Sequence, residues 1–241
     1  MPWARSTFKV MPELSDQLPQ KGNRFYTVPV LIVLFLWWIF WYDQRAMMGW
    51  TRFGLEPGEW AGLQGILFAS FLHGSMEHLA HNSLPVLFLS MALFYYYPKQ
   101  AGYIALTAAT IPWIGVWFFG RPSVHIGASA FIYFMATFLF FSGLWKKNRY
   151  LLATALLVVF LYGGLFWGLF PIEERVSYEG HLSGAVTGLL FSLVWRNKGP
   201  GPTKWVWEEE VPDIEVVDAE DISAAARFRT VKYIYRTEQD P

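Results

Sequence analysis

Residues 127–145, GASAFIYFMATFLFFSGLW, form a largely apolar run in which Ser129 lies near the beginning. Fifty-two residues later, His181 lies near the beginning of a second such run, YEGHLSGAVTGLLFSLVW, at residues 178–195. A polar side chain within hydrocarbon is costly and therefore usually marks a functional position. A serine and a histidine that meet inside a bilayer would form a nucleophile and its general base. The chemistry that this pair suggests is hydrolysis of a peptide bond.

The composition of the 241-residue chain is that of a polytopic membrane protein, since 54% of its residues are hydrophobic and only 16% are charged. Several apolar runs reach the ~20 residues that a helix needs to cross ~30 Å of hydrocarbon. The formal net charge is zero, so nothing indicates binding to nucleic acid. The chain has no cysteine, which excludes disulfides, thiolate catalysis and cysteine-ligated metals but leaves the redox compartment open.

The apolar runs predict an all-α membrane protein with six transmembrane helices, which cover residues 25–42, 77–97, 102–119, 125–145, 150–170 and 178–195. Short connections predict that the third and fourth spans are antiparallel neighbours, and likewise the fifth and sixth. Between the first two spans, residues 43–59 are polar enough to lie at the surface. The apolar stretch 60–72 is too short to cross and fits an interfacial or re-entrant segment.

The distribution of basic residues predicts how the helices are oriented. One side of the predicted bundle carries Arg5, Lys9, Lys21, Arg24, Lys99, Lys146, Lys147, Arg149, Arg196 and Lys198, and the other side carries only Arg45, Arg52, Arg121 and Arg175. By the positive-inside rule, the N-terminal segment 1–24 and the tail 197–241 are both cytoplasmic. The core at 25–196 then has Ser129 and His181 near the same, outer face. The N-terminal segment lacks the pattern of a cleavable signal.

Small residues flank both Ser129 and His181. We expect Ser129 in the first turn of its helix, where unpaired N–H groups and the helix dipole would stabilise an oxyanion. Gly127 permits another helix to approach, and Gly184 and Gly188 share one face of the helix that carries His181. If this face contacts the fourth span, Ser129 Oγ and a ring nitrogen of His181 should lie within hydrogen-bond reach. The alternative is that both segments are packing motifs and that His181 is a structural hydrogen-bonding residue.

No carboxylate completes a triad with these two side chains. Glu179 lies two residues before His181 and therefore on another face of the helix. Tyr133, one turn after Ser129, could instead stack on the imidazole and fix its orientation. The alternative is that Tyr133 only packs in the core.

Histidines cluster at the start of the second span, where His73, His78, His81 and Asn82 lie within ten residues. His78 and Asn82 are four residues apart, so they share a helix face and could both donate hydrogen bonds to an oxyanion. The competing interpretation is a metal site formed by His78 and His81, with His73 or Glu77 as the third ligand. Because the spacing matches no zinc motif and the chain has no H-E-x-x-H, we expect no metal and no cofactor.

These residues resemble motifs of the rhomboid family of intramembrane serine proteases over roughly residues 25–196. The matches are Gly127-x-Ser129 with Tyr133 four residues later, His181-x-x-Gly184-x-x-x-Gly188, and His78-x-x-x-Asn82 with His73 five residues ahead. Each motif alone is weak, but together, in the family's order and on matching spans, they are highly specific. Two positions depart from the family's common pattern: Trp60 is followed by Ala61 and not by arginine, and Gly180 precedes His181 where alanine is frequent.

The resemblance implies that Ser129 is the nucleophile, that His181 is the base, and that His78, Asn82 and the Ser129 N–H group form the oxyanion hole. It also implies that residues 60–72 form a membrane-embedded first loop and that the fifth span with the following loop admits the substrate. Substrates would be single-pass or other transmembrane proteins, cut near the outer face after a small residue. The location would be a bacterial inner membrane. The alternative is a catalytically inactive relative that binds membrane-protein clients, against which the intact Ser129 and His181 argue.

Overall fold

The computed structural model describes residues 23–161, 167–172 and 176–203, and this part of the chain is helical. The long helices are α2 (Arg24–Ala46), α4 (Met76–Tyr96), α5 (Ala101–Phe119), α6 (Ser129–Trp145), α7 (Arg149–Leu161) and α9 (Tyr178–Val194). Short helical segments between α2 and α4 are η1 (Trp50–Phe53), η2 (Trp60–Gln64), α3 (Gly65–Phe68) and η3 (Ala69–Phe71). Thr203 ends the compact unit to which all these elements belong.

Three of the helices are long and apolar enough to cross a membrane, namely α2, α4 and α5, with 23, 21 and 19 residues. Helices α6 and α9 have 17 residues each and α7 has 13. The predicted fifth span runs to residue 170, but residues 162–166 lie outside the described part. That the chain crosses the membrane six times therefore stays a prediction.

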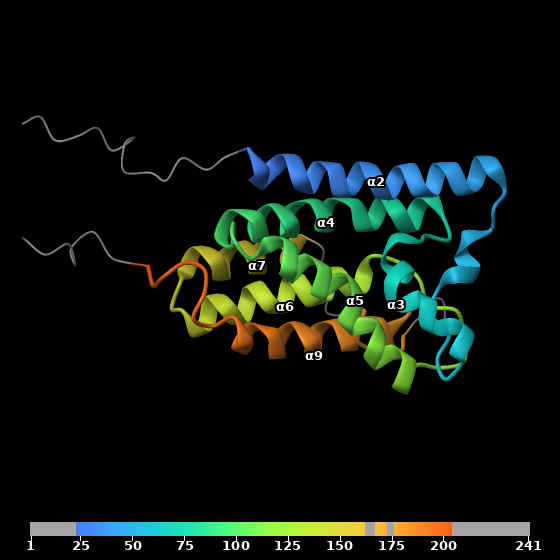
Figure 1. Cartoon of the computed structure of the whole chain (residues 1–241). Helices are drawn as coiled ribbons and strands as arrows, with labels where there is room; N and C mark the ends of the chain where they lie inside the picture. The colour runs from blue at the N-terminus through green and yellow to red at the C-terminus, as the bar shows by residue number, and fades with distance from the viewer. Residues whose placement is uncertain (1–22, 162–166, 173–175, 204–241) are drawn as a thin grey trace, which may run out of the picture. The chain divides into compact units, whose positions relative to one another are not determined.

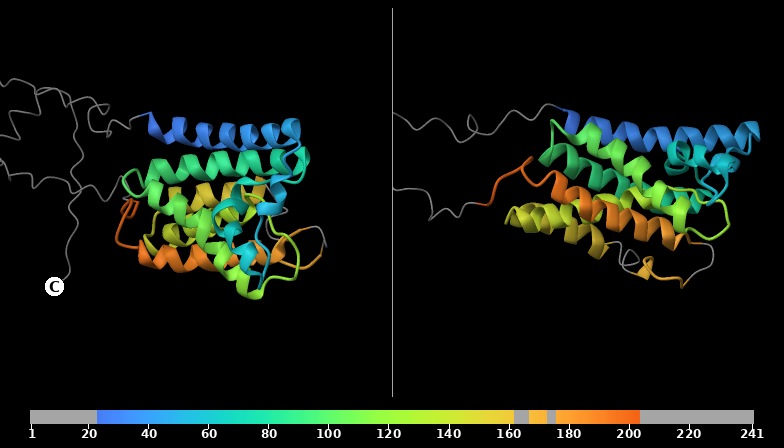
Figure 2. Two further views of the ribbon diagram at one scale, coloured as in Figure 1. Left: turned by 45° about the vertical axis from the view of Figure 1, so that its right-hand side comes forward. Right: turned by 60° about the horizontal axis from the view of Figure 1, so that its bottom comes forward.

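The helices alternate in direction, so that their ends collect at two opposite ends of the bundle (Figure 1). Helices α4, α6 and α9 all begin at the end where α2 finishes, and both further views give the same arrangement (Figure 2). Ser129 is the first residue of α6 and His181 is the fourth residue of α9. The prediction that the two residues lie at the same end of the bundle is therefore confirmed, whereas the side of the membrane that this end faces stays a prediction.

Helix α6 is the centre of the bundle, with α4, α5, α7 and α9 packed around it (Figure 1). Its side chains are buried on nearly every face, and the largest that are fully enclosed are Ile132, Phe134, Met135, Phe138 and Leu139. A helix that is apolar all round is expected in such a position. The nucleophile candidate therefore begins the most enclosed helix in the described part of the chain.

Among the described helices, α6 and α9 form the most extensive contact, and two glycines make it possible. A Cβ atom on Gly184 would collide with the carbonyl oxygen of Ala130, and one on Gly188 would collide with the carbonyl oxygen of Phe134. The backbones thus touch directly, as the small-residue motif predicts. This contact places the residue after Ser129 against the residue three positions after His181.

We expect Gly184→Ala to destabilise the protein by about 2 kcal/mol or more, because the new methyl group meets a backbone carbonyl that cannot rotate away. Unfolding in mixed detergent micelles measures the change. Gly102→Ala is the matched control, since a Cβ on Gly102 in α5 meets nothing within 4 Å. Equal stability of the two variants would contradict the tight contact between α6 and α9.

The first loop, residues 47–75, is attached to the rest of the bundle by hydrogen bonds to its backbone and side chains. Leu55 and His125 form an isolated β-bridge, with N···O distances of 3.0 and 2.8 Å. The hydroxyl of Ser70 donates to the Ala109 carbonyl and accepts from Trp113 Nε1, both at 2.7 Å. The loop is therefore held without an arginine after Trp60. Its exposed apolar side chains include Trp60, Leu67 and Phe68.

Two expectations about this region and its neighbours were wrong. Residues 43–59 do not all lie at the surface, because Asp43 is buried and accepts from the Trp50 N–H group, and Leu55 is fully enclosed. The fourth span does not begin at His125, because this residue pairs with Leu55 and the helix starts at Ser129. Within the described residues, α7 packs on α6 and α4, and α9 packs on α6 and α5. Gly168, near the end of the predicted fifth span, contacts His181 of α9, so the prediction that the fifth and sixth spans are neighbours stays open.

Candidate active site

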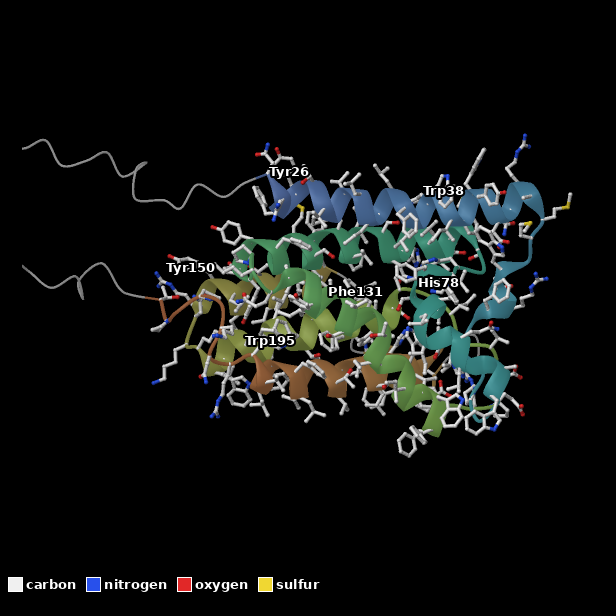
Figure 3. The ribbon with its side chains drawn as sticks, viewed as in Figure 1. Tyr26, Trp38, His78, Phe131, Tyr150 and Trp195 are labelled. Atoms are coloured by element: carbon white, nitrogen blue, oxygen red, sulfur yellow. The ribbon has the colours of Figure 1, made fainter. Side chains whose placement is uncertain are left out.

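A cavity of about 1000 Å³ lies at the end of the bundle where α4, α6 and α9 begin. Its lining includes all the principal residues that the sequence predicts for the site: Ser129, His181, Tyr133, His78 and Asn82. His78 is seen at this end of the bundle in Figure 3. The structure thus brings together side chains that are up to 103 positions apart in the sequence.

Ser129 is half-buried and lies at the N-terminus of α6, with Ala128 as the N-cap residue. Among the described residues, its backbone N–H group has no hydrogen-bond partner, which is usual for the first turn of a helix. Gly127 just before it has a φ of +118°, and a Cβ here would lie 2.6 Å from His78 Cε1. The glycine therefore allows the His78 ring to lie against the backbone that leads to Ser129.

His181 is only 8% exposed and is held by two neighbours. The Tyr133 ring stacks on its imidazole, with ring centroids 4.2 Å apart and planes inclined by 15°. The Nδ1 atom lies 2.7 Å from the carbonyl oxygen of Gly168, between α7 and α9. Because a carbonyl only accepts, this contact assigns a proton to Nδ1, and the neutral ring then keeps a lone pair on Nε2. The stacking was predicted from the sequence, whereas the Gly168 carbonyl was not.

Ser129 and His181 share the cavity, but no hydrogen bond joins their side chains in the part of the chain that the structure describes. Hydrogen bonds between catalytic groups are often long without substrate and tighten in the complex. The contact of Ala130 with Gly184 lies directly beside the two residues and fixes the spacing of their helices. The prediction that Ser129 Oγ lies within hydrogen-bond reach of a ring nitrogen of His181 therefore stays open.

Asn82 is buried and is connected to His73, which precedes α4. Asn82 Nδ2 lies 3.2 Å from Nε2 of His73, and the backbone N–H group of Ala128 donates to the same nitrogen at 3.4 Å. Burial, together with the charge of nearby His78, lowers the pKa of His73 to about 3. His73 is therefore neutral at physiological pH, and its Nε2 accepts from both groups. It links the Asn82 amide to the turn before Ser129.

The histidines at the start of α4 are not arranged as a shared metal site. His73 already uses Nε2 to accept two hydrogen bonds, and the side chain of His81 is exposed. No group of three His, Asp or Glu side chains within residues 23–161, 167–172 and 176–203 is placed to hold one ion. The geometry therefore does not favour the metal interpretation.

The carboxylate of Glu179 is directed to Arg121. Glu179 Oε1 lies 3.6 Å from Arg121 Nε and accepts from the Arg121 backbone N–H group at 3.3 Å. The Arg121 guanidinium also donates from Nη2 to the Val176 carbonyl at 2.7 Å. As the sequence spacing predicts, this carboxylate serves another face of α9 than His181 does.

The cavity lining contains a second serine and histidine in contact, which sequence reasoning missed. His125 Nδ1 lies 2.7 Å from Ser177 Oγ, and its Nε2 lies 3.0 Å from the carbonyl oxygen of Arg121. The Ser177 hydroxyl also accepts from the Gly180 N–H group at 3.2 Å, so Ser177 is the N-cap of α9. The serine three residues before Gly180 is the sequence signal for this cap. His125 thus ties the start of α9 to the connection between α5 and α6.

Comparisons with known proteins bear on the same region. A model of the Rhomboid domain matches residues 58–198. Uncharacterized proteins of Mycobacterium tuberculosis and Mycobacterium bovis are 36% identical over 151 residues, which are 57% of this chain and 61% of each relative. An uncharacterized protein of Mycobacterium leprae is 33% identical over 144 residues, or 53% of this chain and 54% of the relative. The matched parts thus span little more than half the length of these relatives.

The matched residues contain the elements from η2 to α9, and with them Ser129, His181, His78 and Asn82. The matched family, together with the three long apolar helices, identifies an integral membrane protein of α-helical architecture. Because the family model covers more than half of the 241 residues, the chain belongs to the rhomboid family.

Proposed function

We propose that the protein is an intramembrane serine endopeptidase that uses Ser129 as nucleophile and His181 as general base. The observation that carries the proposal is the setting of His181. Its Nδ1 is bonded to the Gly168 carbonyl and its ring is stacked on Tyr133, so the basic Nε2 belongs to a neutral ring of fixed orientation. This ring lines the same cavity as a serine at a helix N-terminus.

The proposed reaction has two stages. Ser129 Oγ attacks the carbonyl carbon of the scissile bond while His181 Nε2 takes the hydroxyl proton, and the protonated ring then gives this proton to the leaving amine. A water molecule then gives a proton to His181 Nε2 and attacks the acyl carbon, and the protonated ring returns a proton to Ser129 Oγ as the ester bond breaks. In both stages the oxyanion would accept hydrogen bonds from His78, Asn82 and the Ser129 N–H group. The Gly168 carbonyl takes the place of the missing carboxylate, because it orients the ring and accepts from Nδ1.

The proposed substrates are transmembrane segments of other membrane proteins, cut in the bilayer near the outer face. The cavity at the ends of α6 and α9 supports a site that a helix end reaches from the membrane. The distribution of Lys and Arg supports cytoplasmic termini, with Ser129 towards the opposite face. A bacterial inner membrane is the location that fits this arrangement.

A reconstituted cleavage assay tests the function. Purified protein in phosphatidylcholine vesicles is mixed with a single-span substrate, and mass spectrometry identifies the products. We expect the wild-type protein to cut the substrate at one position near the outer face and so to yield two fragments, with or without a chelator. The His181→Ala variant should yield no fragments. If the wild-type protein binds the substrate but does not cleave it, the alternative of a catalytically inactive family member that binds membrane proteins would be favoured. Loss of cleavage with chelator alone would favour a metal site.

The role of Gly168 leads to a separate prediction. Replacement of Leu169 with its α-hydroxy acid analogue converts the Gly168–Leu169 amide into an ester, whose carbonyl accepts hydrogen bonds more weakly. We expect nitrogen NMR of labelled His181 to detect more of the Nε2–H tautomer. The rate of labelling by a fluorophosphonate should fall about fivefold, the effect of one neutral hydrogen bond. An unchanged tautomer would contradict the orienting role of the carbonyl, whatever the activity.

A further inference from the structure

The cavity that contains Ser129 has a second, polar part beside the connection between α5 and α6, where Arg121 and Ser123 line it. Arg121 is the only Lys or Arg in the lining that the structure describes, and no described Asp or Glu lines the cavity. Among the residues that the structure describes, a substrate bound at Ser129 therefore meets one fixed positive charge there and no fixed negative charge.

Arg121 is held in place by three groups. Its Nη2 donates to the Val176 carbonyl at 2.7 Å, its Nε lies 3.6 Å from Glu179 Oε1, and its Cζ lies 5.8 Å from the centre of the Tyr178 ring. A side chain that is already ordered loses less conformational entropy when it binds a ligand. The guanidinium is thus organised for recognition before a substrate arrives.

The two charges of the Arg121–Glu179 pair differ strongly in exposure. The side chain of Arg121 is 34% exposed and that of Glu179 only 6%, and Glu179 does not line the cavity. Among the described residues, Nη1 of Arg121 has no hydrogen-bond partner. The pair therefore presents its positive end and unused N–H donors to the cavity, while its negative end is covered.

We propose that Arg121 forms a subsite for the carboxylate of an acidic substrate residue, Asp or Glu, close to the bond that Ser129 attacks. A guanidinium edge matches a carboxylate through two parallel N–H···O hydrogen bonds, and an amide of the same shape gives only one acceptor and no charge. The inference rests on the proposed function and specifies which of its membrane-protein substrates are preferred.

The test measures kcat/KM for matched single-span substrates that carry Asp or Asn at each position flanking the cut. In neutral vesicles, wild type is expected to prefer Asp at one position by about tenfold, the scale of a charge-assisted hydrogen bond. Arg121→Gln alone would leave Glu179 buried without its partner. The main variant is therefore Arg121→Gln/Glu179→Gln, for which the Asp:Asn ratio should fall to about one.

Two further variants make the result specific to the guanidinium. Arg121→Lys keeps the charge and the ion pair but loses the planar edge, so the preference should fall to a few-fold. Arg52→Gln changes an exposed arginine of η1 that does not line the cavity, and the ratio should stay as in wild type. Retention of the full preference in the double variant, or no Asp preference in wild type at any position, would overturn the proposal.

A binding measurement separates this inference from the proposed function. The Asp and Asn substrates are titrated against Ser129→Ala protein, and the ratio of Kd values is compared with that of Ser129→Ala/Arg121→Gln/Glu179→Gln. Tighter binding of the Asp substrate only with Arg121 present supports the subsite even if wild type cleaves nothing, in which case the proposed function alone fails. Equal Kd values for the two substrates with Arg121 present overturn the subsite even where cleavage at Ser129 occurs.

Discussion

Replacement of Ser129 by alanine is expected to abolish covalent labelling by a fluorophosphonate and to lower kcat for a transmembrane substrate by on the order of 10⁶-fold. The reason is that no other group would carry the acyl intermediate. In the described residues the Ser129 side chain makes no hydrogen bond, so its loss should leave the fold intact. Gel fluorescence and intact mass after labelling in detergent measure the effect, and thermal unfolding checks the fold.

Ser177 is a control for the identity of the nucleophile, because it lines the same cavity and its Oγ lies 2.7 Å from His125 Nδ1. We interpret this contact as a helix cap, so Ser177→Ala should cost about 1 kcal/mol of stability and still take the label on Ser129. Labelling that survives Ser129→Ala but disappears in Ser177→Ala would transfer the nucleophile to the second pair. Such a result would contradict the proposed mechanism directly.

The positions of the helices were predictable where a boundary coincides with a change in polarity. Helices α4 and α5 begin within one residue of the predicted spans, at Met76 and Ala101. The start of α6 was missed by four residues because His125 to Ala128 continue the apolar run. What removes His125 from the helix is its pairing with Leu55, seventy positions earlier, and hydropathy carries no information about such a contact.

The candidate site was predictable to the extent that it consists of side chains in local motifs. Ser129 and Tyr133 lie on one helix and His181 lies on another, and the small residues of these helices predict that they pack closely. The structure places all three side chains in the lining of one cavity. The Gly168 carbonyl could not be foreseen, because every residue carries a carbonyl and only the tertiary fold selects one. The partners of Arg121 could not be foreseen either, because Val176 and Glu179 lie 55 and 58 positions later in the sequence.

Removal of the Asn82 amide is expected to lower kcat by about 10²–10³-fold, because the oxyanion would lose one donor at the moment its charge develops. KM should change little, since this interaction forms only in the transition state. Asn82→Ala is compared with Ser83→Ala, whose hydroxyl donates to the Leu79 carbonyl and accepts from Trp37 of α2. Steady-state cleavage in vesicles measures both constants, and Ser83→Ala should retain the wild-type kcat.

His78 extends the same argument, because it lines the cavity one turn before Asn82 and lies against Gly127. If both side chains bind one oxyanion, His78→Ala should also lower kcat, and the double variant should lose less than the product of the two single effects. Asn82→Ala also removes the hydrogen bond to His73, so a structural role would appear as lower thermal stability with a raised KM. Wild-type kcat in Asn82→Ala would exclude Asn82 from the oxyanion hole.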